Sequence, residues 1–180
     1  MQPTIATERL TLRPFRRADA KAVQRLAGER DIAKTTMTIP HPYEDGLAED
    51  WIAGQEVACR EGKAITLAIA LRVDGSLVGG IGLRVDRAHD KAELGYWVGK
   101  PFWNCGYATE AAQALVNFGF RELQLNRIHA AHMAKNPSSG RVMEKIGMVR
   151  EGTARQGMKK WGRYEDLVCY AILRDDWSRT

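Results

Sequence analysis

Long apolar runs and paired cysteines are both missing from this chain. It contains no stretch of 18 or more apolar residues, so no segment is expected to span a membrane. Its first ten residues, M-Q-P-T-I-A-T-E-R-L, lack the apolar core of a signal peptide. The three cysteines (Cys59, Cys105 and Cys169) are far apart and form no C-x-x-C, which argues against a disulfide framework or a zinc site. We therefore expect a cytoplasmic location and no metal.

Internal repeats, low-complexity tracts and linkers are also lacking, so residues 1–180 are expected to form one domain. The composition is that of an ordinary globular protein, 44% hydrophobic and 27% charged. The formal net charge of +5 suits either nucleic acid or a polyanionic small ligand. Because no RNA-recognition, KH or zinc-finger pattern accompanies this charge, nucleic acid is the minor alternative.

The stretch from Glu93 to Gly119 is the most informative part of the sequence. It predicts a short apolar strand over 94–98, an irregular loop over 99–106 and a helix that follows without a gap. The apolar stripe of that helix consists of Ala108, Ala111, Ala112, Leu115, Val116 and Gly119. The N–H groups that precede its first turn have no helical acceptors, and together with the helix dipole they predict a phosphate-binding site. An ordinary strand-to-helix turn is the alternative.

Two common phosphate motifs are excluded at this loop. No Gly-Lys-Ser/Thr follows the glycines, as a P-loop requires, and the G-x-G-x-x-G of dinucleotide-binding domains is absent. Gly106 allows the backbone to approach an anion closely, and Ala108 adds no bulk.

Alternation and turn signals predict the other elements. Further strands are expected at 9–15, 65–71, 77–85, 127–133, 148–156 and 164–173, and further helices after Asp19, over 48–62 and from Pro137 to Gly147. Asp74-Gly75 predicts a two-residue hairpin turn, and Gly79, Gly80 and Gly82 indicate bulges or close backbone approach. The order β-α-α-β-β-β-α-β-α-β-β predicts a mixed sheet with helices on both faces.

The segment from Ile32 to Tyr43 is predicted to be a loop because it contains two prolines. It also carries several apolar side chains, Met37 and Ile39 among them. Either these side chains line a pocket or they pack on the core, and the sequence leaves both readings open.

Five blocks of sequence, in order, resemble one family. They are T-E-R-L-T-L-R-P-F, E-L-G-Y-W-V, W-N-C-G-Y-A-T-E-A, N-P-S-S-G-R-V-M-E-K-I-G-M and Y-A-I-L-R-D-D-W. Over nearly the whole chain they resemble the GNAT acetyltransferases, in the branch of the RimJ and RimL protein N-terminal acetyltransferases. The resemblance implies the GNAT acyl-CoA N-acyltransferase fold. That fold is α/β (α+β), with a mixed, mostly antiparallel central sheet of about seven strands flanked by helices.

The resemblance also implies acetyl-CoA as the donor and coenzyme A as the product. The family's phosphate loop is Q/R-x-x-G-x-G/A, in which Gly106 and Ala108 match, Trp103 stands where Gln or Arg is common, and Asn104 replaces a frequent glycine. The residues it places along the coenzyme are Trp97, Val98, Trp103, Asn104, Cys105, Gly106, Tyr107, Ala108, Thr109, Asn136, Ser139 and Arg141. The strand edge near Trp97 would pair with the pantetheine amides and offer an N–H to the thioester oxygen.

Direct transfer requires a neutral amine, whereas a lysine amine has a pKa of about 10.4 and an α-amine about 7.7–8. Glu93 is the first candidate for the general base, through a water, with a surface carboxylate at a strand end as the alternative. Asn136 resembles the asparagine that hydrogen-bonds the pantetheine or a water, and it also fits a helix cap. Ser139 resembles the residue that donates to the leaving sulfur. Tyr164 and Tyr170 offer phenols, but spacing does not separate a site from core packing.

The predicted function is therefore transfer of an acetyl group from acetyl-CoA directly to a primary amine. The acceptor is either a protein N-terminal α-amine, of the ribosomal-protein type, or a small-molecule amine. A non-catalytic module that binds or senses acyl-CoA is the alternative from another class. The resemblance is also compatible with a homodimer.

Overall fold

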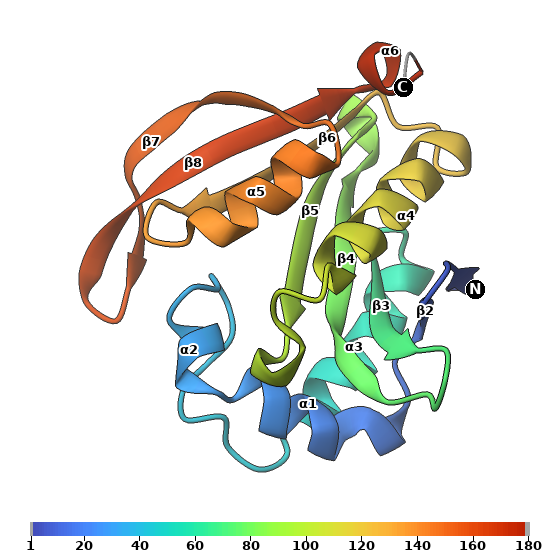
Figure 1. Ribbon diagram of the computed structural model, residues 1–180, viewed down its shortest axis with the longest axis vertical. Helices are drawn as coiled ribbons and strands as arrows, with labels where there is room; N and C mark the ends of the chain where they lie inside the picture. The colour runs from blue at the N-terminus through green and yellow to red at the C-terminus, as the bar shows by residue number, and fades with distance from the viewer. Residues whose placement is uncertain (1, 179–180) are drawn as a thin grey trace.

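The predicted strands join in one mixed sheet in the computed structural model, which describes residues 2–178 (Figure 1). The strands are β1 Ile5–Ala6, β2 Leu10–Pro14, β3 Ala64–Leu71, β4 Leu77–Asp86, β5 Lys91–Val98, β6 Arg127–Met133, β7 Val149–Lys160 and β8 Arg163–Leu173. Their spatial order is β1-β2-β3-β4-β5-β6-β8-β7, and of these neighbours only β5 and β6 are parallel. The predicted mixed, mostly antiparallel sheet is confirmed. It has eight strands rather than about seven, because the two-residue β1 was not predicted.

Helices cover both faces of the sheet. They are α1 Ala20–Ala27, α2 Arg30–Ala33, α3 Leu47–Arg60, α4 Tyr107–Arg121, α5 Pro137–Lys145 and α6 Arg174–Trp177. α1 and α3 pack on one face, and α4 and α5 on the other (Figure 1). The sequence analysis missed α2 and α6, since four residues are too few to show a helical period. Among residues 2–178, no helix is both long and apolar enough to cross a membrane.

α4 packs on the sheet through the predicted stripe. Ala111, Leu115 and Val116 are fully buried, as is Phe120 at the end of the stripe. Gly119 lies where a Cβ atom would approach Ile128 Cδ1 to 2.8 Å, so the absence of a side chain allows α4 to come close to β6. The helix period therefore predicted the buried face correctly.

The side chains of β5 alternate between the two faces. Leu94, Tyr96 and Val98 belong to the core under α4 and α5, whereas Trp97 packs in the core with α1 and α3. Because successive residues of a strand point to opposite faces, Glu93 lies on the same face as Trp97.

The predicted two-residue turn at Asp74-Gly75 is wrong. β3 ends at Leu71 and β4 begins at Leu77, so the connection is longer. The Asp74 carboxylate accepts a hydrogen bond from the Ser76 N–H at 2.9 Å, and Gly75 has φ +76°. An aspartate that bonds the backbone two residues ahead stabilises this wider turn. The predicted irregularity at the β4 glycines is confirmed, because the β3–β4 register shifts opposite Gly79.

Truncation of a core side chain tests the packing of α4. We expect Phe120→Ala to lower the free energy of unfolding by about 3–5 kcal/mol, because the ring is fully buried and leaves a cavity. Val73→Ala is the control: Val73 is 87% exposed, and its loss should stay within about 0.5 kcal/mol. Urea unfolding measures both, and equal losses in the two variants would contradict the assigned core.

Candidate active site

A gap opens between β5 and β6 in the middle of the sheet. Their last pair in register is Glu93 with His129, yet β5 continues to Val98 and β6 to Met133. Figure 1 shows that β5 and β6 diverge. Within residues 2–178, each of these two strands thus presents an edge with no neighbouring strand over its second half. Such an edge is able to bind an extended, amide-containing ligand.

The backbone of β5 directs alternate residues toward this gap. The N–H of Gly99, just after β5, donates to a β4 carbonyl at 2.8 Å, so the N–H and C=O groups of Tyr96 and Val98 face the other way, into the gap. The Val98 carbonyl already accepts the indole N–H of Trp103 at 2.7 Å. The backbone N–H groups of Tyr96 and Val98 are therefore the donors on this edge, whereas Trp97 directs its backbone groups to β4.

The loop between β5 and α4 presents N–H groups without acceptors. No group among residues 2–178 accepts a hydrogen bond from the N–H groups of residues 104–109, and the first bond of α4 runs from Glu110 N to Gly106 O at 3.1 Å. Asn104 (φ +61°) and Gly106 (φ +80°) both adopt the left-handed conformation. Asparagine adopts it more readily than other non-glycine residues, so Asn104 serves in place of the common glycine. This arrangement fits an anion such as a diphosphate.

The loop and the gap open into one cleft with a volume of about 1030 Å³. The predicted site residues that line it are Glu93, Trp97, Val98, Trp103, Asn104, Gly106, Tyr107, Ala108, Thr109, Asn136, Ser139 and Arg141. Cys105 does not line it; its side chain is exposed, and its carbonyl accepts a hydrogen bond from Arg9 Nη1 at 2.9 Å. The structure therefore brings every predicted site residue except Cys105 to a single cleft.

Tyr96 is a site residue that the sequence analysis missed. Its hydroxyl lies 2.8 Å from Ser139 Oγ and donates to the Ser139 carbonyl at 2.9 Å, which links β5 to α5. Burial raises the pKa of Tyr96 to about 12, against the opposing effect of the Ser139 hydrogen bond. Of the two tyrosines whose phenols were the predicted candidates, Tyr164 is 62% exposed, and the Tyr170 hydroxyl donates to Glu144 Oε1 at 3.0 Å. Alternation along the E-L-G-Y-W-V strand was the signal that places Tyr96 under α5.

The start of α5 brings Asn136 and Ser139 to the cleft. Pro137 is the first helical residue, as predicted, and Asn136 precedes it, but the Asn136 side chain makes no capping hydrogen bond. Asn136 thus occupies the cap position, but the alternative reading of its side chain as a capping group is wrong. Arg141, an exposed residue one turn further on, donates to Ser138 Oγ at 2.8 Å.

Glu93 lies where the gap begins, on the face covered by α1 and α3. Arg84 Nη2 is 2.5 Å from Glu93 Oε2, and the Glu93 side chain is 28% exposed. Burial lowers the pKa of the neighbouring His129, while the charge of Glu93 opposes that shift. Among residues 2–178, no group of three or more His, Cys, Asp or Glu side chains is arranged to hold a metal ion.

The loop over 34–43 lines the cleft on this same face. Ile39 and Tyr43 also pack against the core formed with α1 and α3, so both readings left open for the segment hold. The ammonium of Lys160, from the β7–β8 hairpin, donates to the carbonyls of Ile39 at 2.9 Å and Met37 at 3.4 Å. Lys160 is only 8% exposed, and burial lowers its pKa. The hairpin thus holds the loop in place.

The family model described as an acetyltransferase (GNAT) domain matches residues 9–149. The chain belongs to the GNAT acetyltransferase family. It is 33% identical over 179 residues to the putative ribosomal N-acetyltransferase YdaF of Bacillus subtilis, a match that covers 95% of this chain and 94% of that protein.

Solved structures give the same result. A GNAT acetyltransferase from Bacillus anthracis has a TM-score of 0.85 at 32% identity, over 96% of this chain and 99% of that chain. RimJ of Mycobacterium smegmatis, solved with a CoA-disulfide, has a TM-score of 0.85 at 26% identity, over 98% of this chain and 91% of that chain. GNAT acetyltransferases use acetyl-CoA, and this acetyltransferase is of the RimJ/RimL-like N-acetyltransferase branch.

Titration of the tyrosines tests the environment of Tyr96. The tyrosinate absorbance of wild type and of Tyr96→Phe is measured as the pH rises, and the difference between the two reports Tyr96. We expect this difference to have its midpoint near pH 12, because burial disfavours the phenolate. The phenol then stays a protonated donor at pH values where acceptor amines become neutral. Far-ultraviolet circular dichroism at each pH is the control for an intact fold. A midpoint near that of free tyrosine, about 10, would contradict the assignment.

Proposed function

We propose that this acetyltransferase transfers an acetyl group from acetyl-CoA directly to a primary amine that enters from the face covered by α1 and α3. The cleft between β5 and β6 is the observation that carries the proposal. It connects the two faces of the sheet, with the phosphate loop and Ser139 on one side and Glu93 on the other. Donor and acceptor are thus able to approach from opposite faces and to meet at the gap.

The residues around the gap fit the coenzyme. The N–H groups of residues 106–108 hold its diphosphate, and those of Tyr96 and Val98 bond the pantetheine amides or the thioester oxygen. Asn136 and Arg141 lie along the same path. When bound, the coenzyme supplies an acetyl group activated as a thioester.

Two side chains handle the protons. Glu93 accepts the proton of the incoming ammonium through a water, from the acceptor face. Ser139 donates a hydrogen bond toward the sulfur while its Oγ accepts one from the Tyr96 hydroxyl, which turns from the Ser139 carbonyl to Oγ, 2.8 Å away. A thiol has a pKa of about 8.5 and leaves nearly unaided, so Ser139 acts as a donor and not as an obligatory acid.

The acceptor class stays a proposal. The YdaF relative, named a ribosomal N-acetyltransferase, supports a protein N-terminal α-amine, and a small-molecule amine is the second candidate. The single sheet supports the proposal that residues 1–180 form one domain. The three free cysteines support the proposal of a cytoplasmic location. The homodimer rests on the family resemblance alone.

Replacement of the proposed base tests the function. We expect Glu93→Gln to lower kcat about a hundredfold or more with little change in the KM for acetyl-CoA, because only proton removal is lost. Thiol release from acetyl-CoA is measured across a panel of N-terminal peptides and small amines. Glu56→Gln, an exposed carboxylate on α3, is the matched control and should keep full activity. Wild type that binds coenzyme A but acetylates no acceptor would favour the sensing module instead.

Removal of the Lys160 ammonium tests the acceptor loop. We expect Lys160→Met to raise the KM for the amine roughly tenfold while the KM for acetyl-CoA stays constant, because the two carbonyl contacts that are lost belong to the loop on the acceptor face and not to the phosphate loop. Lys160→Arg, which keeps the charge and the donors, should recover part of the loss. An equal rise in both KM values would show that Lys160 supports the fold and not the acceptor side.

A further inference from the structure

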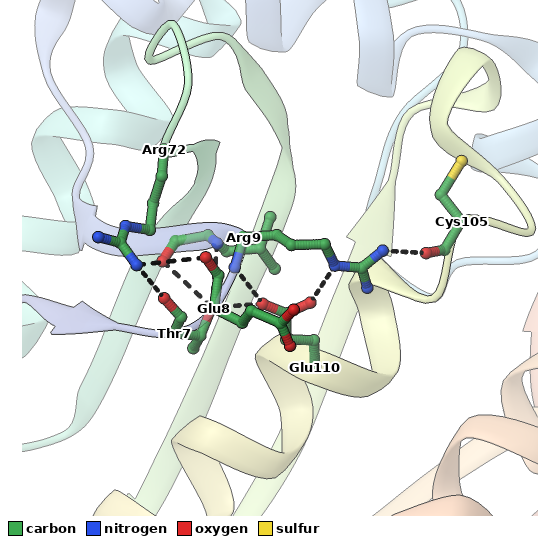
Figure 2. A network of polar contacts seen from close by, with 7 residues as sticks. Thr7, Glu8, Arg9, Arg72, Cys105 and Glu110 are labelled. Carbon is green, nitrogen blue, oxygen red and sulfur yellow. Dashed lines mark hydrogen bonds and ion pairs between the residues drawn. The ribbon is translucent and has the colours of Figure 1, made fainter.

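The turn between β1 and β2 contacts the phosphate loop through Arg9 (Figure 2). Arg9 donates from Nε to Glu110 Oε2 at 2.7 Å and from Nη1 to the Cys105 carbonyl at 2.9 Å. Its guanidinium also lies 4.8 Å from the centre of the Tyr107 ring. One side chain therefore contacts the loop, the first residue of α4 and the first turn of that helix.

The contact with Cys105 orients a peptide plane. In a trans peptide the C=O of one residue and the N–H of the next point in opposite directions. Because Arg9 holds the Cys105 carbonyl outside the cleft, the Gly106 N–H is directed away from Arg9. Gly106 lines the cleft, whereas neither Cys105 nor Arg9 does. A Cβ atom at Gly106 would lie 3.3 Å from Arg9 Nη2, so Arg9 packs directly behind this glycine.

The contact with Glu110 places a cation beside a carboxylate at the start of α4. Glu110 also accepts from the Thr7 hydroxyl at 2.6 Å and the Arg9 N–H at 2.8 Å. Burial raises the pKa of Glu110. These two hydrogen bonds and the one from the Arg9 guanidinium nevertheless hold that pKa below its usual value. An ionised Glu110 without Arg9 would repel an anion at the N-terminus of the same helix.

We propose that Arg9 is a positioning residue for the coenzyme: it holds the Cys105–Gly106 peptide with its N–H toward the diphosphate and compensates the charge of Glu110. The inference rests on the coenzyme site of the proposed function. Arg9 itself lies outside the cleft and acts through the loop. The β1–β2 turn, about a hundred residues away in sequence, thus becomes part of the phosphate site.

The chain offers a matched control. Arg72 donates from Nη1 to the carbonyls of Thr7 at 2.9 Å and Glu8 at 3.2 Å, so it supports the same turn (Figure 2). It makes no contact with the phosphate loop or with Glu110 among the bonds of residues 2–178. Loss of Arg72 therefore weakens the turn without freeing the Cys105 carbonyl.

The test compares coenzyme A binding by calorimetry in wild type, Arg9→Met and Arg72→Met, with thermal unfolding of each. We expect Arg9→Met to raise the Kd for coenzyme A roughly ten- to a hundredfold and the KM for acetyl-CoA in parallel, with the KM for the amine unchanged. Arg72→Met should stay within about twofold of wild type. Unchanged affinity in Arg9→Met, or equal weakening in both variants, would overturn the proposal.

A double variant separates charge from geometry. We expect Arg9→Met/Glu110→Gln to recover part of the lost affinity, because repulsion is removed while the peptide plane stays free. A double variant that binds coenzyme A more weakly than Arg9→Met would overturn the role given to charge. Wild type that binds no coenzyme A would overturn both this inference and the proposed function. Binding that weakens in Arg9→Met without acetylation of any amine would support the inference and overturn the function alone.

Discussion

The short pairing of β5 with β6 is the constraint on which the site depends. β5 is paired with β4 along the whole length of β5, and β6 is paired with β8 from Arg127 to Met133, so each strand is held by its other neighbour. The two strands share only three residue pairs, which end at Glu93 and His129. Beyond that point the sheet carries unpaired polar edges in its interior. A ligand that supplies amides is the natural partner of such edges.

The same opening divides the chemistry between two faces of the sheet. On one face Tyr96 and Ser139 are linked by a hydrogen bond across the gap, next to the anion-binding loop. On the other, Gly80, Gly82 and Gly95 line the cleft without side chains beside Glu93. The alternation of β5 thus separates the groups that suit a donor from those that suit an acceptor.

The anion-binding loop is supported from several directions. The indole of Trp103 closes it onto the Val98 carbonyl, and Lys100, at its start, forms an ion pair with Asp31 of α2 at 2.7 Å. The hydrogen bond from Lys100, and after it the one from Lys34, lowers the pKa of Asp31 to about 2. The β1–β2 turn supports the opposite end of the loop. Loops that bind ligands need this kind of support from a rigid scaffold, because their own backbone bonds are few.

Local pattern by itself determined the strand–loop–helix unit, the buried stripe of α4 and the start of α5 at Pro137, because period, glycine and proline act within a few residues. The same local rules failed at Asp74-Gly75, where the aspartate prefers a bond to Ser76 in a wider turn. Only the tertiary structure decided that Tyr96 meets Ser139 and that Arg9 meets Cys105, 43 and 96 residues apart in the chain. Contacts at such separations depend on which strands become neighbours, and no periodicity within one segment encodes that choice.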